Sequence, residues 1–561
     1  MKIPMSFIQR APELANQYTE DRVLRSYLRR VLPPAMRSVI DAELDMLGDH
    51  AAAAWISRLN RPRSEPTLTR FDPWGERIDR VEVTAAWKES RELSARFGLV
   101  ASGHETRWGA QARIHQFALV YLHHVASAFF TCPLAMTDGA ATCIQAAQNA
   151  RLIDRALPHY LSRDPAQFWI SGQWMTETTG GSDVAGTETV ARTDENGRWR
   201  LHGRKWFTSA VHADTALALA RPEGAGTGAG SLALFYLEPR RPDGRWRNLT
   251  VERLKDKLGT RELPTAEVEL HGAPAELVGE LKQGVRTIAP MLNVTRTWNS
   301  ICAIAQMRRG IALARDYANR RVVSGRPLAE QPLHLHTLAG LQAEFEAAFH
   351  LAFYVAELLG RVQAGEGDQT HANLLRLLTP MTKLWTAKLA VTISSEVLES
   401  FGGAGYIEDT GLPELLRDAQ VLPIWEGTSN VLGLDFLRAM KGAGGIASLL
   451  SAQRSLLAQV DSAELSLATR AVRESTTQVT EWLRIATSDA GQLASGARDF
   501  TISLARCFAA SLLLRHAAWS RSAENDPRPA AAARRFIAHG LVQFDASTTD
   551  DARMLGTDVH I

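Results

Sequence analysis

One stretch decides the fold class of this chain: Val190-Ala-Arg-Thr-Asp-Glu-Asn-Gly-Arg-Trp-Arg-Leu-His-Gly203. A short run ends at Thr193, turn residues occupy 194–197, and a second short run begins at Arg198. Two short runs on either side of a turn that contains Asn-Gly predict strand, turn and strand. The stretch therefore indicates β structure in the middle of a chain whose flanks have helical periodicity.

The same texture extends from Phe168 to about Leu281. Residues 231–237 form a short apolar run after the glycine-rich loop 223–230, and residues 266–270 alternate between apolar and polar side chains. Short runs separated by turn residues are typical of small all-β domains. We predict a β domain over residues 166–282, folded as a small barrel or a sandwich.

Residues 1–165 are predicted to form an N-terminal helical domain. Apolar residues recur at helical spacing over 41–59, and residues 108–131 form a long, mostly apolar helix candidate. His123 and His124 lie within this candidate. Adjacent side chains on a helix point in different directions, so these histidines are interpreted as structural and not as a shared metal site.

Helical patterning returns after the β domain. We predict a helical bundle over residues 283–441 and a helical extension over residues 442–561. The expected helices of the bundle cover 300–322, 341–362 and 374–401, with another after Glu426, and the extension has a strongly apolar helix at 500–519. The fold class is therefore mainly α with a central β domain.

Composition sets broad limits on location and partners. The 561 residues are 45% hydrophobic and 22% charged, with a net charge of +2, which is ordinary for a globular protein without a general affinity for nucleic acid. The four cysteines fit no metal spacing or disulfide framework. The N-terminal residues lack the apolar core of a signal peptide, and no run of about 18 apolar residues occurs. We expect a cytoplasmic protein without a membrane span.

A candidate catalytic carboxylate lies in Leu422-Pro-Ile-Trp-Glu-Gly-Thr-Ser-Asn-Val-Leu-Gly-Leu434. Glu426 has apolar residues on both sides, which favours a poorly solvated carboxylate that takes a proton readily. Gly427 lets another molecule approach the backbone, and Thr428 and Asn430 offer donors and acceptors to a polar cofactor. The alternative is a surface glutamate that opens a helix.

A candidate cofactor site combines Trp174-Met-Thr-Glu-Thr-Thr-Gly-Gly-Ser-Asp-Val184 with Lys205-Trp-Phe-Thr-Ser209. Backbone amides in a glycine loop can hold a pyrophosphate or the polar edge of a flavin, and Trp206 offers a flat apolar surface. The alternative is a β-turn beside a core tryptophan. No Rossmann or P-loop pattern occurs. The candidate residues are Gln173, Met175, Thr176, Gly181, Ser182, Trp206, Phe207, Thr208 and Ser209.

Taken together, four motifs resemble those of the acyl-CoA dehydrogenases. The first motif is the cofactor pair above, in which Thr178 stands where that family usually has proline. The second is Arg417-Asp418 followed by residues 424–430. The third is Arg321-Val-Val-Ser-Gly325 with Gln331 downstream, in which Ser324 replaces a phenylalanine. The fourth is Glu399-Ser-Phe-Gly-Gly-Ala-Gly-Tyr406, in which Glu399 replaces a glutamine.

The resemblance implies an enzyme with FAD, an acyl-CoA substrate and a homotetrameric assembly. Glu426 is implied as the base, and Arg321 as a ligand of the FAD pyrophosphate in a neighbouring subunit. Further implied flavin ligands are Gln331, Gly402, Gly403, Gly427, Thr428 and Asn430. Some family members place the base in a Glu-Arg pair, but the matching pair here is Thr295-Arg296. Electron-transfer flavoprotein is one electron acceptor that the resemblance allows. An oxidase, in which oxygen reaches the reduced flavin, is a third candidate function.

Three features resemble the AidB-like, alkylation-response branch of the family. They are Arg70-Phe-Asp-Pro-Trp-Gly-Glu-Arg-Ile-Asp-Arg-Val81, Arg253-Leu-Lys-Asp-Lys-Leu-Gly259 and the long C-terminal extension. That branch implies association with DNA and weak dehydrogenase activity, which is the alternative function. Residues 441–561 hold 13 Lys or Arg against 12 Asp or Glu, and this near-neutral balance argues against a strong DNA groove.

Overall fold

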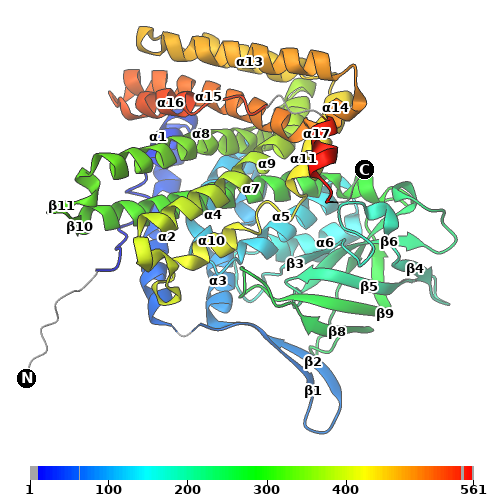
Figure 1. Ribbon diagram of the computed structural model, residues 1–561. Helices are drawn as coiled ribbons and strands as arrows, with labels where there is room; N and C mark the ends of the chain where they lie inside the picture. Colours follow the sequence, from blue (N-terminus) through cyan, green and yellow to red (C-terminus); the bar gives the residue numbers. More distant parts are fainter. Residues whose placement is uncertain (1–9, 62, 545–548, 559–561) are drawn as a thin grey trace, which may run out of the picture. The chain divides into compact units, whose positions relative to one another are not determined.

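A computed structural model describes residues 10–61, 63–544 and 549–558. The chain packs into two compact units. Residues 60–298 form one unit, and the segments up to Leu59 and from Asn299 onward form the other. Figure 1 shows the strands of the first unit and the long helices of the second.

The unit of residues 60–298 combines helices with a curved sheet. Its helices are α3 (Ala85–Arg96), α4 (Ala112–His124), α5 (Thr131–Ala146) and α6 (Ala150–Tyr160). Its strands are β1 (Thr67–Phe71), β2 (Arg77–Glu82), β3 (Ser171–Trp174), β4 (Val190–Thr193), β5 (Trp199–Ser209), β6 (Thr215–Pro222), β7 (Ala233–Leu237), β8 (Leu249–Leu254) and β9 (Thr265–Leu277). The predicted strands at 190–193, 198–203, 231–237 and 266–270 each overlap an observed strand, although β5 begins at Trp199 and β7 at Ala233.

The sheet closes on itself and so decides between the two predicted β architectures. The pairing order runs β6, β4, β5, β9 and β7, and β7 pairs back onto β6, while β3 and β8 add to β6 and β9. Along β6, Leu217 and Leu219 pack against residues of α5 and α6, whereas Ala216 and Ala218 face the core of the barrel. This period of two is what a strand between two apolar layers requires.

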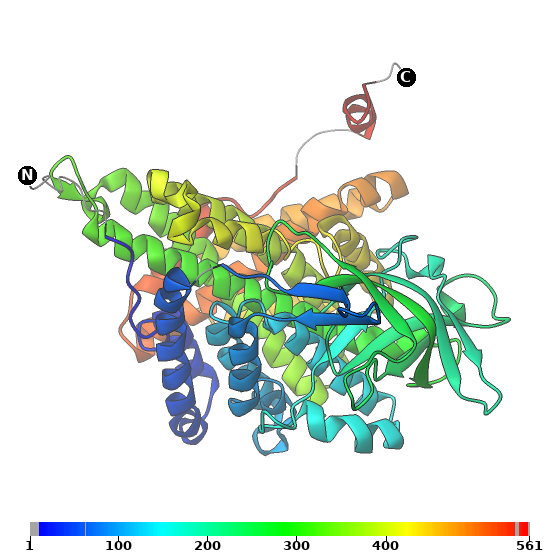
Figure 2. The same ribbon diagram turned by 90° about the horizontal axis from the view of Figure 1, so that it is seen from below.

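Two helical predictions in the first 165 residues need correction. Strands β1 and β2 form a hairpin, drawn in blue in Figure 2, and β1 packs on β8. Asp79 of the hairpin accepts the backbone N–H of Val251 (3.0 Å). The predicted helix over 108–131 is two helices, α4 and α5, because the chain turns through positive φ at Ala128 and Phe129. His123 and His124 are buried and bond to Ser94 and Thr131, in agreement with their structural interpretation.

The other unit is almost entirely helical. Its elements are α1 (Arg22–Val31), α2 (Pro34–Asn60), most of α7 (Gly284–Arg320), β10 (Val322–Val323), β11 (Arg326–Pro327), α8 (Pro332–Gln363), α9 (Gln369–Ser400), α10 (Pro413–Ala419), α11 (Ser429–Gly442), α12 (Ala447–Ala458), α13 (Ser466–Ala486), α14 (Ala490–Ser495), α15 (Ala497–Ala523), α16 (Arg528–Ala538) and α17 (Thr549–Leu555). Each predicted bundle helix overlaps α7, α8, α9 or α11.

Local signals explain where the helices begin and end. Asp368 caps α9 in a reciprocal capping box with His371, and the chain leaves the helix at Gly402, which has a φ of +60°. The extension does not stand apart, because α15 packs on α8, α9 and α11. Over residues 10–61, 63–544 and 549–558, no helix has the length and apolarity that a membrane crossing needs.

Candidate functional site

An irregularity in β5 presents two aromatic rings side by side. Lys205 pairs with Val268 on β9, but Thr208 pairs with Ala266, so β5 has one more residue than its partner over this step. Such a bulge bends a strand and re-aims its side chains. Trp206 is consequently half-buried and Phe207 is 57% exposed, although neighbours on a regular strand face opposite sides.

A buried ion pair joins the two predicted cofactor motifs. The Lys205 ammonium lies 2.6 Å from Glu177 Oε1, and its side chain is 0% exposed. The same carboxylate accepts the Thr189 hydroxyl (2.6 Å) and the Glu188 backbone N–H (2.6 Å). Burial raises the pKa of Glu177, but Lys205 and these hydrogen bonds outweigh it and leave the pKa lowered. The carboxylate is therefore ionised at neutral pH.

The loop that follows β3 lies directly against the bulge. Trp206 donates its backbone N–H to the Thr176 carbonyl (3.0 Å). A Cβ on Gly181 would lie 2.9 Å from the Thr176 hydroxyl, so only glycine lets the loop fold back this closely. Ser182 is exposed, and Met175 is partly buried. The structure thus brings both predicted motifs together in one place.

Two unsatisfied polar atoms in this region fit a polar ligand. Gln173 Oε1 on β3 and the Thr208 hydroxyl on β5 are buried without a hydrogen-bond partner among the described residues. Leaving such groups unpaired costs about 1–3 kcal/mol each, so they mark a place where a ligand or water is expected. Ser209 instead bonds to the Thr265 hydroxyl (3.1 Å). The donor and acceptor set fits the polar edge of a flavin ring.

Lys255 is a neighbour of this site that the sequence did not single out for it. Its ammonium lies 3.4 Å from the centroid of the Trp206 ring and 2.7 Å from the Glu267 carboxylate. The cation therefore covers Trp206 while its charge is balanced by Glu267. The surroundings of Trp206 are consequently polar as well as aromatic.

In the helical unit, Glu426 stands on a strained turn before α11. Its φ is +58°, and that of Gly427 is +104°. A glutamate in the left-handed region costs on the order of 1 kcal/mol, and such strain persists where the surroundings impose it. Lys383 on α9 donates to the Gly427 carbonyl (2.6 Å), and Asn299 donates to the Leu422 carbonyl (3.2 Å). These two buried side chains hold the turn at both ends.

The alternative interpretation, in which this stretch simply opens a helix, accounts for only part of the structure. Thr428 is the N-cap residue of α11, but its side chain accepts no capping hydrogen bond. Asn430 is exposed in the first turn of the helix. The half-buried Glu426 lies two residues before the N-cap, outside the helix. A capping role therefore does not account for its position.

The remaining predicted ligands of the helical unit lie in two other places. Arg321 leads into the hairpin β10–β11, and Gln331 closes the hairpin with a bond to the Val323 carbonyl (3.0 Å). Gly402 and Gly403 follow α9, with open space where a Cβ would project. At about 1.5 Å per residue, the end of α9 at Ser400 is roughly 25 Å from Lys383, so Gly402 beyond it is not beside the Glu426 turn.

Thr295, the position where some acyl-CoA dehydrogenases carry their base, is not a competing base. It is buried on α7, and its hydroxyl donates to the Met291 carbonyl (3.1 Å). A threonine hydroxyl in such a bond is not ionised at neutral pH. Lys383 and Asn299 are functional candidates that sequence reasoning missed. A lysine within the apolar run of α9 was the available signal for the first of them.

Comparisons with known proteins agree along the length of the chain. Four family models match: the Adaptive response protein AidB N-terminal domain (residues 10–164), the Acyl-CoA dehydrogenase middle domain (172–273), the Acyl-CoA dehydrogenase C-terminal domain (282–441) and the Acyl-CoA dehydrogenase 11 C-terminal domain-like model (447–556).

Similar proteins cover most of the chain. Acyl-CoA dehydrogenase family member 11 of Caenorhabditis elegans is 40% identical over 91% of this chain and 86% of its own length. The AidB protein of Escherichia coli K12 is 35% identical over 69% of this chain and 71% of its own length. The crystal structure of the Caenorhabditis elegans protein ACDH-11 in complex with C11-CoA superposes with a TM-score of 0.94 at 38% identity, covering 100% of this chain and 98% of that one.

Proposed function

Since this chain belongs to the acyl-CoA dehydrogenase family, in its AidB-like branch, we propose that it oxidises an acyl-CoA thioester at the Cα–Cβ bond. FAD is the cofactor of this family. The substrate class places the reaction in fatty acid metabolism, and the proposed location is the cytoplasm. Glu426 is the proposed base.

The reaction divides between the protein and its cofactor. Glu426 takes the proton from Cα of the thioester through its carboxylate, which becomes a carboxylic acid. Bound FAD would supply the acceptor for the hydride that leaves Cβ, and a C=C bond would then join the two carbons. Gln173 and Thr208 would hold the polar edge of the flavin with the atoms that lack partners. Trp206 would supply apolar contact to its ring system through the part of the indole that Lys255 does not cover.

The observation that carries this proposal is the backbone of Glu426. A non-glycine residue at φ +58° is held there only if its neighbours pay for the strain, and Lys383 fixes the adjacent carbonyl. A held carboxylate approaches its substrate carbon without reorganising, which is a large share of the advantage of an enzymatic base. The turn supports a role in which the direction of the carboxylate matters.

The first substrates to test follow from a relative. ACDH-11 has been crystallised with C11-CoA, and it superposes on this whole chain. We propose acyl-CoA thioesters with chains of about that length as candidate substrates. A series from four to sixteen carbons, with flavin reduction as the signal, ranks them.

The test is anaerobic reduction of the bound flavin, followed by its absorbance in a stopped-flow instrument. Glu426→Gln keeps the size of the side chain and removes the base, so we expect reduction to slow about 100-fold or more while acyl-CoA still binds. Glu481→Gln, on the exposed face of α13, is the matched control and retains the wild-type rate. Reduction of the Glu426 variant at the wild-type rate would place the base elsewhere.

The same material separates the alternatives that the sequence left open. Reoxidation by oxygen at a rate comparable with electron-transfer flavoprotein would favour an oxidase. If no acyl-CoA reduces the wild-type flavin and duplex DNA binds with a steep salt dependence, the DNA-associated function is favoured. We expect substrate reduction, and electron-transfer flavoprotein as the faster acceptor.

A homotetramer is the proposed assembly. The hairpin that carries Arg321 exposes Val322 and Val323, and the start of α8 exposes Leu333 and Leu335. Grouped apolar side chains on the outside of one subunit are typical of a surface that a partner covers. This placement supports the role that the family resemblance implies for Arg321, which is to bind the flavin of a neighbour.

A further inference from the structure

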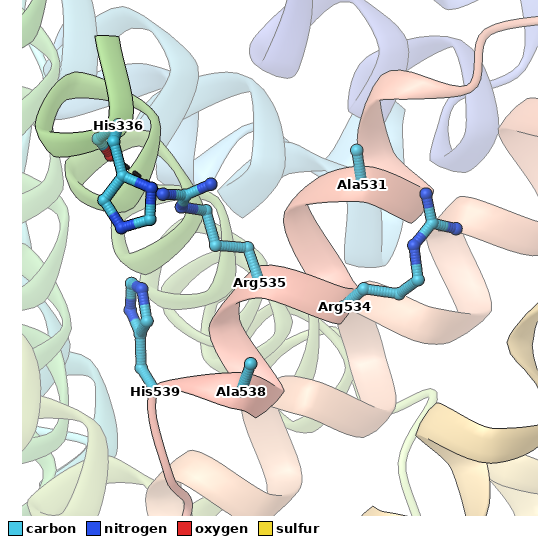
Figure 3. Close-up of a pocket in the computed structure, with 6 residues that line it drawn as sticks. All are labelled: His336, Ala531, Arg534, Arg535, Ala538 and His539. Carbon is cyan, nitrogen blue, oxygen red and sulfur yellow. Dashed lines mark hydrogen bonds between the residues drawn. The ribbon is translucent and has the colours of Figure 1, made fainter. Parts of the chain in front are cut away.

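A pocket in the helical unit is lined by none of the residues to which a role is assigned above. It has a volume of about 400 Å³ and is lined by His336, Ala531, Arg534, Arg535, Ala538 and His539. His336 comes from α8, and the others come from α16 or the residue after it. Figure 3 shows the side chains of His336, Arg535 and His539 converging, while Arg534 points in another direction. The volume suits a small molecule.

The charges around this pocket do not balance. Arg506 binds Glu344 through both carboxylate oxygens (2.8 and 3.0 Å), and Arg534 pairs with Glu464. Arg535 has no carboxylate partner among the described residues. Three guanidinium groups therefore face two carboxylates, and the positive charge in excess belongs to Arg535. A complementary ligand is an anion.

The hydrogen-bond capacity of Arg535 is only partly used. Its Nη2 donates to the His336 carbonyl (3.0 Å), which fixes the direction of the guanidinium. Its Nε is buried and has no partner among the described residues. A guanidinium that is held by one bond and keeps unpaired donors is prearranged for the forked binding of a phosphate.

A glycine keeps the space between the converging groups open. A Cβ on Gly340 of α8 would lie 3.4 Å from Cε1 of His539 and 4.0 Å from Nε of Arg535. His539 is held from its other side, where Nδ1 lies 3.0 Å from Glu344. The edge of this imidazole and the unpaired Nε consequently face the same small volume beside α8.

We propose that this pocket binds the phosphate group of a small molecule, with Arg535 as the main ligand and His336 and His539 as its partners. None of its lining residues is the proposed base or a predicted flavin ligand, so the proposal stands whether or not Glu426 is the base. A ligand there would bridge α8 of the bundle and α16 of the extension. It would thereby link the occupancy of the pocket to the packing of the extension.

Isothermal titration calorimetry with pyrophosphate tests the proposal on the full-length protein. FAD is present in excess, so that pyrophosphate does not report on an empty flavin site. Arg535→Gln should weaken binding by about tenfold or more, because a charge-assisted contact is lost. Arg454→Gln is the matched control. It removes the same charge from an exposed position on α12 that does not line the pocket, and we expect affinity to change by less than about twofold.

A second variant guards against a folding defect in the first. Ala538→Glu adds a carboxylate to the lining from an exposed helical position and removes no existing contact of a charged group. It should abolish pyrophosphate binding while the circular dichroism spectrum and melting temperature remain those of the wild type. Equal losses in the Arg454 and Arg535 variants, or the absence of binding by the wild type at millimolar pyrophosphate, would overturn the proposal.

Three competing ligands identify the source of the phosphate. Inorganic phosphate and ADP should each displace pyrophosphate from the wild-type protein, and the tighter of the two shows whether a free anion or a nucleotide fits the pocket. A duplex oligonucleotide is the third competitor. The contrary outcome is displacement of pyrophosphate by the duplex at a far lower total concentration of phosphate groups than ADP requires. If this displacement is lost in the Arg535 variant, the site binds a polymer and the small-molecule proposal is wrong.

Discussion

Removal of the Lys205 ammonium tests how the two cofactor motifs are held together. In Lys205→Met the side chain keeps most of its length, but Glu177 loses its cation and the Leu219 carbonyl loses a donor that lies 2.8 Å away. Glu177 retains its bonds to Thr189 and to the Glu188 N–H, so its carboxylate stays buried and charged. Breaking a buried pair from one side leaves an uncompensated charge.

The expected magnitude follows from the burial of both groups. Loss of one partner from a pair this deeply buried costs roughly 3–5 kcal/mol. For a folding unit of about 150–250 residues, each kcal/mol moves the melting temperature by about 2–4 °C. The transition of the barrel unit should therefore fall by roughly 6–20 °C. FAD retention should fall with it. Lys205 directly precedes Trp206, Glu177 directly follows Thr176, and the backbones of Trp206 and Thr176 are hydrogen-bonded to each other.

The loss should depend on pH in a defined direction. The pKa of Glu177 is lowered in the folded protein, so its contribution to stability is present above the unfolded pKa of about 4.3 and is lost as the pH falls through the folded pKa. In the variant, the buried carboxylate no longer has this advantage. The difference in melting temperature between wild type and variant should thus narrow as the pH falls below about 4.3.

Differential scanning calorimetry at several pH values measures this difference. Lys88→Met, at an exposed position on α3, is the matched control and should melt within about 1–2 °C of the wild type. The double variant Lys205→Met with Glu177→Gln should recover much of the loss, since no buried charge remains. A folded Lys205 variant that melts with the wild type at pH 7 would refute the reasoning.

Three further predictions concern the flavin, the assembly and the helical part of the barrel unit. Trp206→Ala should loosen FAD by about tenfold, measured as flavin absorbance retained after gel filtration, and unchanged retention would contradict its assigned contact. Arg321→Ala should release FAD on dilution while sedimentation still shows an oligomer; a monomer that holds FAD tightly would argue against a shared site. Asp138→Asn should cost roughly 3–5 kcal/mol, because Arg113 loses a buried partner 2.6 Å away. Burial opposes ionisation, but Arg113 and a nearby histidine hold the pKa of Asp138 well below its usual range. The stability lost in Asp138→Asn, measured in unfolding experiments, should therefore shrink at low pH.

Long elements with strong periodicity were predictable from local sequence. The bundle helices α8 and α9 and the strands β4 and β5 arise from patterns of 3.6 and 2 residues that belong to the elements themselves. The hairpin at β1 and β2 was missed, because its short strands depend on contacts with β8 that lie far along the chain. The break at Ala128 and Phe129 was missed for a related reason, since tertiary packing overrides an apolar run that favours one helix.

The candidate site was likewise predictable only where its features are local in sequence. Glu426 and Trp206 stood out as residue types in short motifs, and the motifs alone pointed to a flavin and a carboxylate base. The bulge at Trp206 was not readable, because it is a mismatch of register between β5 and β9. Lys383 and Asn299 also escaped notice, since a residue that bonds to a backbone carbonyl distant in sequence has no local pattern.

By itself, the amino-acid sequence determined the order of helical and β segments, the chemical types available at each motif and the family. These depend on neighbours within a few residues, where side-chain period and turn preference act. Only the tertiary structure decided that the sheet closes, that Glu177 and Lys205 share one buried site, and that Arg535 is left with an unbalanced charge beside His336. Each of these depends on which distant groups meet, because burial and charge pairing are properties of the packed chain and not of any segment.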